Sequence, residues 1–370
     1  ALAGTWVLPD FLKFTKAACR GCFCTHSSRE PRMTQQLNRS TRIRLLPPLL
    51  LLFLSWAVPA LAWDSVGHRL SAAVALEFMG PDTAAELMGI LRAHPRYQQD
   101  FIDQIPAYID RDNEEQMTQW LLGQAAFWPD IARGLPDEER ARYNRSSWHY
   151  TDGAWTRDSA PFQGNVYLGI GAFANVDGIE RGEVDSEEKV SNVVTGIDYN
   201  ASVLSNASAP APARAIALCW VLHLIGDIHQ PLHTGSLYTA SLFETGDRGG
   251  NAIRIGDSNL HARWDRALTA SGVSQELPIL VSRVTGFSRP TIQGVESDWT
   301  AWMNESRSIL LTSVYDADLR EAILDAESSN TGLPGQTLDD VYVVQMQNIS
   351  RQRLGLAGLR LAIFFENELP

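Results

Sequence analysis

Cysteine is scarce in this sequence and unevenly placed. Only four of the 370 residues are cysteine, and Cys19, Cys22 and Cys24 lie near the start. Residues 63–370 contain Cys219 alone, and a lone cysteine cannot form an internal bridge. A disulfide scaffold is therefore excluded, and the body of the chain needs a hydrophobic core. The apolar share of 45% is sufficient for one and excludes wholesale disorder.

The sequence also lacks internal repeats and low-complexity tracts. Residues 63–370 contain no apolar run long enough to span a membrane, so we expect no stable membrane association. No alternation of strands and helices of the βαβ type is visible, and no Pro/Gly/Ser-rich linker divides the body. These absences favour one all-α domain.

Residues 1–62 differ in character from the rest. Three arginines precede an apolar run over residues 45–62 that ends in Ala60-Leu61-Ala62. A basic segment, a short apolar segment and a small-x-small exit are typical of a secretory signal peptide. The alternative is a membrane anchor, but the run is short and contains three prolines. The pattern predicts cleavage before Trp63 and a secreted or periplasmic protein.

The same reasoning divides the chain into three parts. Met33 lies just before the signal and is interpreted as the start, so residues 1–32 are expected to be unstructured upstream translation. Residues 33–62 are the signal peptide and residues 63–370 the functional domain. Removing eight basic and two acidic residues with the first 62 from totals of 31 and 43 leaves a formal charge of −18. Such a surface repels polyanions and at first disfavours a nucleic-acid ligand.

Most of the body has helical periodicity. One short segment, residues 249–255, resembles a strand or hairpin with Gly249-Gly250-Asn251 as its turn. The expected fold class is all-α with a small β-hairpin. The expected helices cover residues 65–78, 83–94 (capped by Asp82), 187–205, 213–229, 260–268, 298–315 and 340–368.

Histidine and aspartate recur at helical spacing in two places. His223 and Asp227 are four residues apart, so a helix places them on one face, and His233 follows in the next loop. His261 and Asp265 repeat the spacing. Imidazole nitrogen and carboxylate oxygen on one face form a ligand pair for zinc. The alternative for each pair is a surface ion pair or a helix cap.

The neighbourhood of His223 bears on that choice. It lies in a strongly apolar stretch, where an unpaired histidine and aspartate would be expensive to bury. A metal ion or a salt-bridge partner would each remove that cost, and the presence of two such pairs favours the metal. His94 and His229 fit neither pattern and are interpreted as structural or surface residues.

Further candidate ligands lie upstream. If the signal is cleaved, Trp63 has a free α-amino group with a pKa of about 7.7–8.0. Its amine and carbonyl can chelate a metal, with His68 following about one helical turn later. Asp130 and His149 are weaker candidates when taken alone, because an aspartate after proline usually makes a turn.

Seven short motifs lie along residues 63–370. They are Trp63-x4-His68, Trp128-x-Asp130, Trp148-His149-Tyr150-x-Asp152, His223-x3-Asp227-x5-His233, Gly226-Asp227 with Gln230-Pro231-Leu232-His233, Gly249-Gly250-Asn251 and Asn259-Leu260-His261-x2-Trp264-Asp265. Together they resemble the motifs of the zinc-dependent single-strand nucleases of the nuclease S-one and nuclease P-one type. The zinc phospholipases C share the fold of that family. The resemblance implies a single, mainly helical domain of this type.

The resemblance also implies three zinc ions per chain. All the ligand positions are filled by the expected residue types. The first ion would be held by Asp130, His149, His223 and Asp227, the second by the Trp63 amine and carbonyl with His68 and the bridging Asp227, and the third by His233, His261 and Asp265.

Catalytic roles follow from the same resemblance. A close pair of zinc ions lowers the pKa of a shared water that attacks phosphorus in line, and Asp130 would orient it. The third ion would stabilise the leaving 3′ oxygen. Arg133 matches a phosphate-contacting arginine of the family, although an exposed helix-end arginine is the alternative. Asn251 is expected to hydrogen-bond near the phosphate.

Tyr150 and Asp152 match the base-recognition positions of the family. Stacking on an aromatic ring is worth about 1–3 kcal/mol per base and needs an unstacked base, hence a single strand. Ordinary core packing is the alternative for Tyr150. Three zinc ions and three ligating carboxylates would leave the pocket cationic, which answers the charge objection.

The expected function is therefore that of a secreted zinc phosphodiesterase. Its substrates would be single-stranded DNA, RNA and nucleotides, its products 5′-phosphorylated, and 3′-nucleotidase activity is a further expectation. One alternative is a zinc phospholipase C acting on phospholipid head groups, and another is a non-catalytic zinc-binding helical protein. No obligate protein partner is expected.

Overall fold

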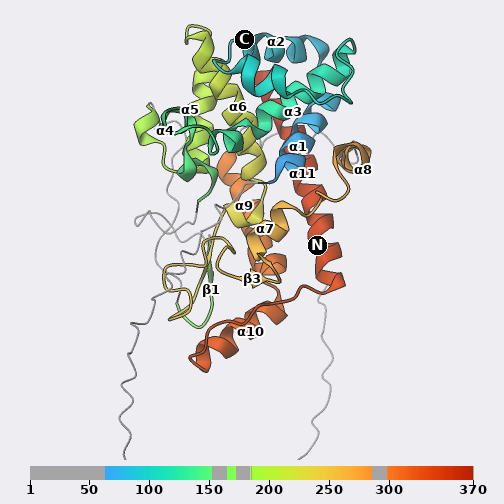
Figure 1. Ribbon diagram of the computed structural model, residues 1–370. Coiled ribbons are helices and arrows are strands. Elements are labelled where there is room, and N and C mark those ends of the chain that lie inside the picture. The colour runs from blue at the N-terminus through green and yellow to red at the C-terminus, as the bar shows by residue number, and fades with distance from the viewer. Residues whose placement is uncertain (1–62, 152–164, 172–183, 185, 286–297, 370) are drawn as a thin grey trace, which may run out of the picture. The chain divides into compact units, whose positions relative to one another are not determined.

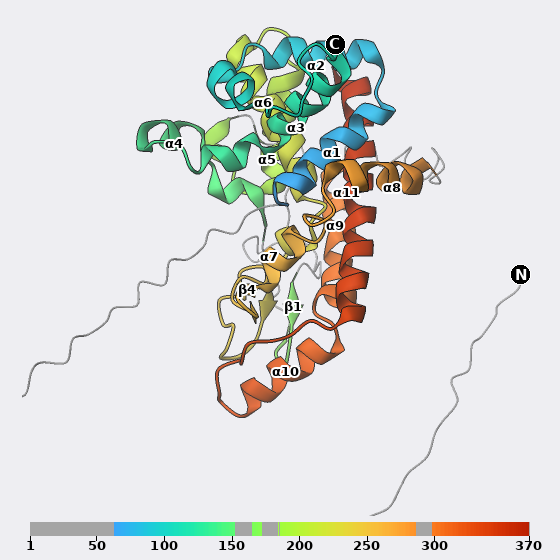
Figure 2. The ribbon, with the colours of Figure 1, turned by 45° about the vertical axis from the view of Figure 1, so that its right-hand side comes forward.

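Four long helices that pack against one another form the centre of the fold (Figure 1). They are α1 (Ser65–Phe78), α3 (Glu114–Ala132), α6 (Ala211–Asp227) and α11 (Asp340–Glu368). Figure 2 shows α1 lying against α11, and α1 also contacts α3 and α6. The computed structural model describes residues 63–151, 165–171, 184, 186–285 and 298–369.

None of the helices in the described ranges is long and apolar enough to cross a membrane. Shorter elements surround the four long helices. In chain order they are α2 (Pro81–Leu91), the π-helix η1 (Tyr97–Phe101), η2 (Ile102–Gln104), α4 (Asp137–Tyr143), η3 (Ser146–His149), β1 (Val166–Tyr167), η4 (Glu187–Lys189), α5 (Val193–Ser205), η5 (Pro231–His233), β2 (Leu237–Tyr238), β3 (Arg254–Ile255), β4 (Ser258–Asn259), α7 (Leu260–Asp265), α8 (Val273–Thr285), α9 (Trp299–Ile309), the π-helix η7 (Leu310–Val314) and α10 (Ala317–Ser328).

Two of the expected helices have the predicted limits, 65–78 and 340–368. Aspartates cap both N-termini: Asp64 accepts hydrogen bonds from the first turn of α1, and Asp339 accepts from the Tyr342 amide of α11. These caps satisfy backbone donors that the helices themselves leave free.

Other predicted limits are wrong. The helix expected over 83–94 begins at Pro81, because proline suits the first helical position, and ends at Leu91, so Asp82 is not its cap. The helix expected over 187–205 breaks after η4 and restarts at Val193, because Asn192 forms a capping box with Thr195. The other expected helices correspond to α6, α7 and α9, with shifted ends and with η7 continuing the last of them.

The small sheets also differ from expectation. β3 and β4 form the antiparallel hairpin, so its turn is at residues 256–257 rather than at Gly249-Gly250-Asn251. β1 pairs in parallel with β2, a pairing that the sequence did not indicate. Since each strand is two residues long, too little periodicity exists to reveal them.

Helix α1 contributes to two hydrophobic clusters. Ala72 and Ala75 pack in one with Trp220, while Leu70 and Val74 pack in the other. The second cluster also contains Trp63 and Trp264. Cys219 is buried in α6 as a free thiol, in agreement with a core that needs no disulfide. Buried polar residues of α1 and α6 lie within this apolar framework.

Candidate metal centre

Asp227, the last residue of α6, has three histidine side chains within 3.5 Å of its carboxylate oxygens. Its Oδ2 lies 3.2 Å from His223 Nε2, one helical turn earlier, and 3.1 Å from His149 Nδ1 of η3. Its Oδ1 lies 3.5 Å from His68 Nε2, which α1 supplies. All four side chains are buried, and they come from three different elements.

A second cluster lies beside the first. His233 and His261 face one another with their Nε2 atoms 3.1 Å apart, and Asp265 Oδ2 lies 3.4 Å from His261 Nε2. His233 Nδ1 is also 3.8 Å from Asp227 Oδ1. The two clusters therefore form one continuous buried site.

Potential ligand atoms come together in three groups that could hold a metal ion. Within each group, these atoms all lie within 4.8 Å of one another. In the described part of the chain the groups are His68, His223 and Asp227; Asp130, His149 and His223; and His233, His261 and Asp265.

Trp63 lies next to this site. Its indole Nε1 donates a hydrogen bond of 3.0 Å to the Gly226 carbonyl oxygen, and the side chain is fully buried. The next residue, Asp64, donates its amide to the Asp265 carbonyl oxygen at 3.3 Å. The first described residue is thereby attached to the residue before Asp227, while the ligand role of its amine stays a prediction.

Several buried polar atoms of the site have no hydrogen-bond partner. Leaving such atoms unsatisfied costs about 1–3 kcal/mol each, and more for charged groups. A divalent cation that took them as ligands would offset this cost, and the set of imidazole nitrogens and carboxylate oxygens suits zinc. The atoms are both ring nitrogens of His68, both oxygens of Asp130, Nε2 of His149, Oδ1 of Asp227 and Oδ2 of Asp265.

Backbone carbonyls orient three of the imidazoles. The Nδ1 atom of His223 donates to Ala126 O at 2.8 Å, that of His233 to His149 O at 2.6 Å, and that of His261 to Gly249 O at 2.6 Å. Each bond fixes the tautomer and turns the Nε2 lone pair towards the clusters. This is the usual outer-sphere arrangement of a metal-binding histidine.

Burial sets the protonation of the site. It lowers the pKa of His68 and His149 well below the ordinary value and that of His223 to about 4. It also raises the pKa values of Asp227 and Asp265 well above their usual range. These three imidazoles are therefore neutral near pH 7, which is the form that binds a metal ion.

Arg133 is not an exposed helix-end arginine, the alternative raised by the sequence. It follows α3 at the C-cap, its side chain is only 13% exposed, and its Nη2 lies 3.1 Å from Asp130 Oδ1. Asp130 is itself inside α3 rather than in a turn after Pro129. The guanidinium therefore lies directly against one of the three ligand groups.

Tyr150 is 47% exposed, which excludes core packing as its role. It lines a cavity of about 170 Å³ together with Arg248, Asn251 and His261. Asn251 directs its amide nitrogen to the Arg248 carbonyl oxygen at 2.9 Å. The remaining predicted base-contact residue, Asp152, lies outside the described residues.

Comparison with known proteins identifies the family. Residues 63–369 match the family model described as S1/P1 Nuclease. The chain belongs to the S1/P1 nuclease family. It is accordingly a nuclease, and the predicted family and mainly helical fold are both confirmed. The match favours the nuclease interpretation over the phospholipase C alternative and over a non-catalytic protein.

Individual relatives carry nuclease names. Endonuclease 4 of Arabidopsis thaliana is 29% identical over 323 residues, covering 82% of this chain and 88% of its own length. Endonuclease 3 of the same plant is 30% identical over 319 residues, covering 82% of this chain and 87% of its own length. Nuclease S1 of Aspergillus oryzae is 29% identical over 170 residues, covering 40% of this chain and 53% of its own.

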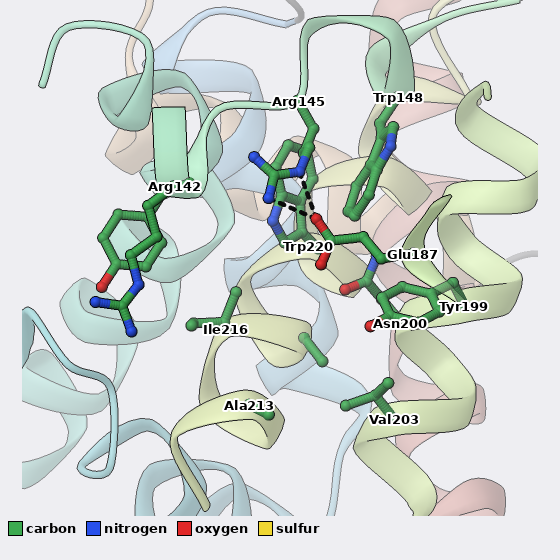
Figure 3. Close-up of a pocket in the computed structure, with 12 residues that line it drawn as sticks. Arg142, Arg145, Trp148, Glu187, Tyr199, Asn200, Val203, Ala213, Ile216 and Trp220 are labelled. Carbon is green, nitrogen blue, oxygen red and sulfur yellow. Dashed lines mark hydrogen bonds and ion pairs between the residues drawn. The ribbon is translucent and has the colours of Figure 1, made fainter. Parts of the chain in front are cut away.

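A second cavity of this S1/P1 nuclease, of about 280 Å³, lies between α4, α5 and α6 (Figure 3). Trp148 and Trp220 form part of its wall, and the Trp220 ring also contacts that of His149, with centroids 5.3 Å apart. Arg145 donates to Glu187 Oε1 at 2.6 Å inside it (Figure 3). These two charges neutralise each other, unlike the unsatisfied atoms of the metal clusters.

Sequence reasoning missed several residues that support the site. Gln230 donates to Asp265 Oδ1 at 2.7 Å, and Asp100 accepts from the Trp128 indole at 2.8 Å. His229 is structural rather than superficial: its Nε2 accepts from Arg360 at 2.7 Å. His94 is buried against the Trp128 ring. Only the Gln-Pro-Leu-His run around Gln230 offered a sequence signal for any of these contacts.

Proposed function

We propose that this S1/P1 nuclease hydrolyses phosphodiester bonds in single-stranded DNA and RNA to 5′-phosphorylated products, acts as a 3′-nucleotidase, and uses three zinc ions. The observation that carries the proposal is the convergence of three His/Asp groups on one buried site around Asp227. The unsatisfied nitrogens and oxygens in those groups support metal binding.

The proposed ligand sets use the residues of the three groups described above, divided as the family resemblance implies and with the Trp63 main chain added. Asp227 would bridge two ions, because its two oxygens face different histidines: Oδ1 faces His68, while Oδ2 faces His223. Zinc bound there supplies a water-derived nucleophile at neutral pH and Lewis-acid stabilisation of the phosphoryl oxygens. The first set is Asp130, His149, His223 and Asp227, the second is the main chain of Trp63 with His68 and Asp227, and the third is His233, His261 and Asp265.

The protein's own side chains orient the substrate. Arg133 presents its guanidinium next to Asp130, where its donors stabilise negative charge on a phosphate. We assign Asp130 the further role of orienting the attacking water. Asn251 lies at the edge of the cavity beside His261, within reach of a phosphate held there.

The proposed substrate preference rests on Tyr150. A half-exposed aromatic ring beside the third His/Asp group offers a stacking surface for one unpaired base. Bases inside a duplex are already stacked and cannot use it. The single-strand preference is thus a consequence of where this ring lies.

The proposed maturation is cleavage of a signal peptide before Trp63, with residues 1–32 upstream of it and the domain over 63–370. The family match that begins at residue 63 supports this division. Cleavage would release the α-amino group of Trp63 and direct the protein to the periplasm or the exterior.

One assay tests the proposal. The protein beginning at Trp63 is given single-stranded DNA, RNA, duplex DNA and phosphatidylcholine, with and without zinc, and the product ends are identified. Zinc-dependent cleavage of the single strands to 5′-phosphates is expected. Equal cleavage of the duplex, cleavage without metal or preference for phosphatidylcholine would each contradict it.

A further inference from the structure

Arg248 has an unusual backbone conformation next to the site. Its φ is +60°, and the two following glycines, Gly249 and Gly250, have φ values of +60° and +80°. Residues with a Cβ rarely adopt this left-handed region, because the side chain crowds the backbone. Strain of this kind is found preferentially at functional sites.

The loop imposes this conformation on Arg248 through neighbouring residues. The Asp247 carboxylate accepts hydrogen bonds from the Leu237 amide (2.9 Å), the Gly250 amide (3.0 Å) and the Tyr315 hydroxyl (2.7 Å). The backbone on either side of Arg248 is therefore fixed by buried contacts. Replacing the arginine side chain leaves all of these contacts in place.

The loop cannot easily move away from the site. A Cβ built on Gly249 would lie 2.4 Å from the Leu232 carbonyl oxygen, and the Gly249 carbonyl accepts the Nδ1 hydrogen of His261. This close approach ties the loop to the third His/Asp group. The Arg248 backbone therefore has a fixed position relative to the third His/Asp group.

The Arg248 side chain is exposed and lines the 170 Å³ cavity with Tyr150. Within the described ranges, no carboxylate pairs with its guanidinium. None of the other described residues that line this cavity is acidic. The Arg248 guanidinium shares this cavity with the Tyr150 ring, so it can reach the edge of a base stacked on that ring, while Arg133, next to Asp130, is assigned to the phosphate.

We propose that Arg248 selects the base that stacks on Tyr150, by donating two parallel N–H groups to the base edge. Guanine offers two adjacent acceptors, O6 and N7, that match the guanidinium fork, and this is the commonest specific arginine contact with bases. The inference rests on the proposed nuclease function and adds a preference for guanine at one position next to the cleaved bond.

The test compares kcat/KM on the sixteen ribodinucleotides for the wild type, Arg248→Ala and Arg248→Lys. Arg254→Ala is the matched control, because Arg254 is an exposed arginine on the neighbouring β3 strand that does not line the cavity. The wild type should prefer guanine at one of the two positions. Arg248→Ala should lower kcat/KM on the dinucleotides with guanine at that position by about tenfold, and should change kcat/KM on the other dinucleotides by no more than about twofold.

The lysine variant separates the base contact from a phosphate contact. Lysine keeps the charge but lacks the planar fork, so Arg248→Lys should also lose the guanine preference. A loss spread equally over all dinucleotides and restored by lysine would show a phosphate contact and overturn the proposal. Unchanged base preference in both variants would overturn it too. If the wild type cleaves no dinucleotide, the proposed function fails first.

Discussion

His68 and His223 stack face to face at the centre of the site, with ring centroids 3.8 Å apart and planes at 15°. They come from α1 and α6, and each ring directs its Nε2 towards a different oxygen of Asp227. Two cationic imidazoles would repel at this separation, so both are neutral and available as ligands. This pair shows how two helices far apart in the sequence build a bridging position for one carboxylate.

Asp227→Asn is expected to remove the paired metal site. The amide keeps the size of the side chain but loses the negative charge that two ions would share, so zinc binding and hydrolysis should both fall more than about a hundredfold. Zinc content and turnover on single-stranded DNA are measured together. Asp137→Asn, at an exposed carboxylate, is the control and should change neither. An asparagine variant with full zinc and full turnover would show that Asp227 is not a ligand.

One extra residue before Trp63 is expected to abolish activity. The buried Trp63 indole, bonded to Gly226 O, anchors this residue next to Asp227, and an added residue would convert its α-amine into a peptide nitrogen that cannot serve as a ligand. Protein beginning at Trp63 is compared with protein carrying one preceding glycine, by zinc content and turnover. A glycine added after Pro370 is the control. Undiminished turnover by the N-terminally extended protein would rule out the amine as a ligand.

Tyr150→Ala should weaken substrate binding more than chemistry. Loss of one stacking contact predicts a rise in KM of about tenfold with kcat within about threefold. Steady-state kinetics on a short single strand measure both constants. Tyr108→Ala removes a tyrosine that is 80% exposed and does not line the cavity beside Tyr150, and serves as the control. If Tyr150→Ala leaves KM unchanged, this ring does not stack with a base.

His94 predicts a pH-dependent loss of stability that is separate from the metal site. Burial lowers its pKa to about 4, and its Nδ1 accepts the Arg96 amide hydrogen at 3.2 Å, so the folded state holds a neutral ring. The stability it contributes is complete above the unfolded pKa of about 6.5 and is lost as the pH falls towards 4.

Urea unfolding at pH 7 and pH 5 measures this effect. Between the two pH values, the free energy of unfolding should fall by about 2 kcal/mol more in the wild type than in His94→Gln, because the variant has no imidazole to protonate at this position. The difference between the two proteins cancels the acid sensitivity of the metal ligands, which both share. Equal losses would mean that His94 titrates normally when folded.

Arg248→Gly is expected to be more stable than Arg248→Ala by about 1 kcal/mol, because glycine adopts a positive φ without crowding. The order should reverse at Arg140, inside α4, where glycine is the poorer helix former. Thermal unfolding of the four variants measures both differences. If the alanine variant is more stable than the glycine variant at both positions, the result would argue against the left-handed conformation of Arg248.

The predictable part of the site was the part encoded at short range. His223 with Asp227, and His261 with Asp265, are four residues apart on one helix, and spacing alone places each pair on one face. The limits of α1 and α11 follow from aspartate caps that stand next to apolar periodicity. Local chemistry decides such features, so a single sequence suffices for them.

The remaining features depend on contacts that no short segment encodes. Asp247 fixes its loop through Tyr315, 68 residues away, and β1 meets β2 across a similar separation. The burial of Arg133 depends on the end of α3 lying next to the cluster that contains Asp130. The left-handed conformation of Arg248 is imposed by these neighbours, because arginine itself does not favour it.

The most direct test of the central claim is the zinc content of the protein that begins at Trp63, measured by mass spectrometry of the elements alongside activity. Three histidine–aspartate groups predict about three zinc ions per chain, loss of turnover when a chelator removes them, and recovery when zinc is returned. A chain that stays fully active after all metal has been removed would contradict the account.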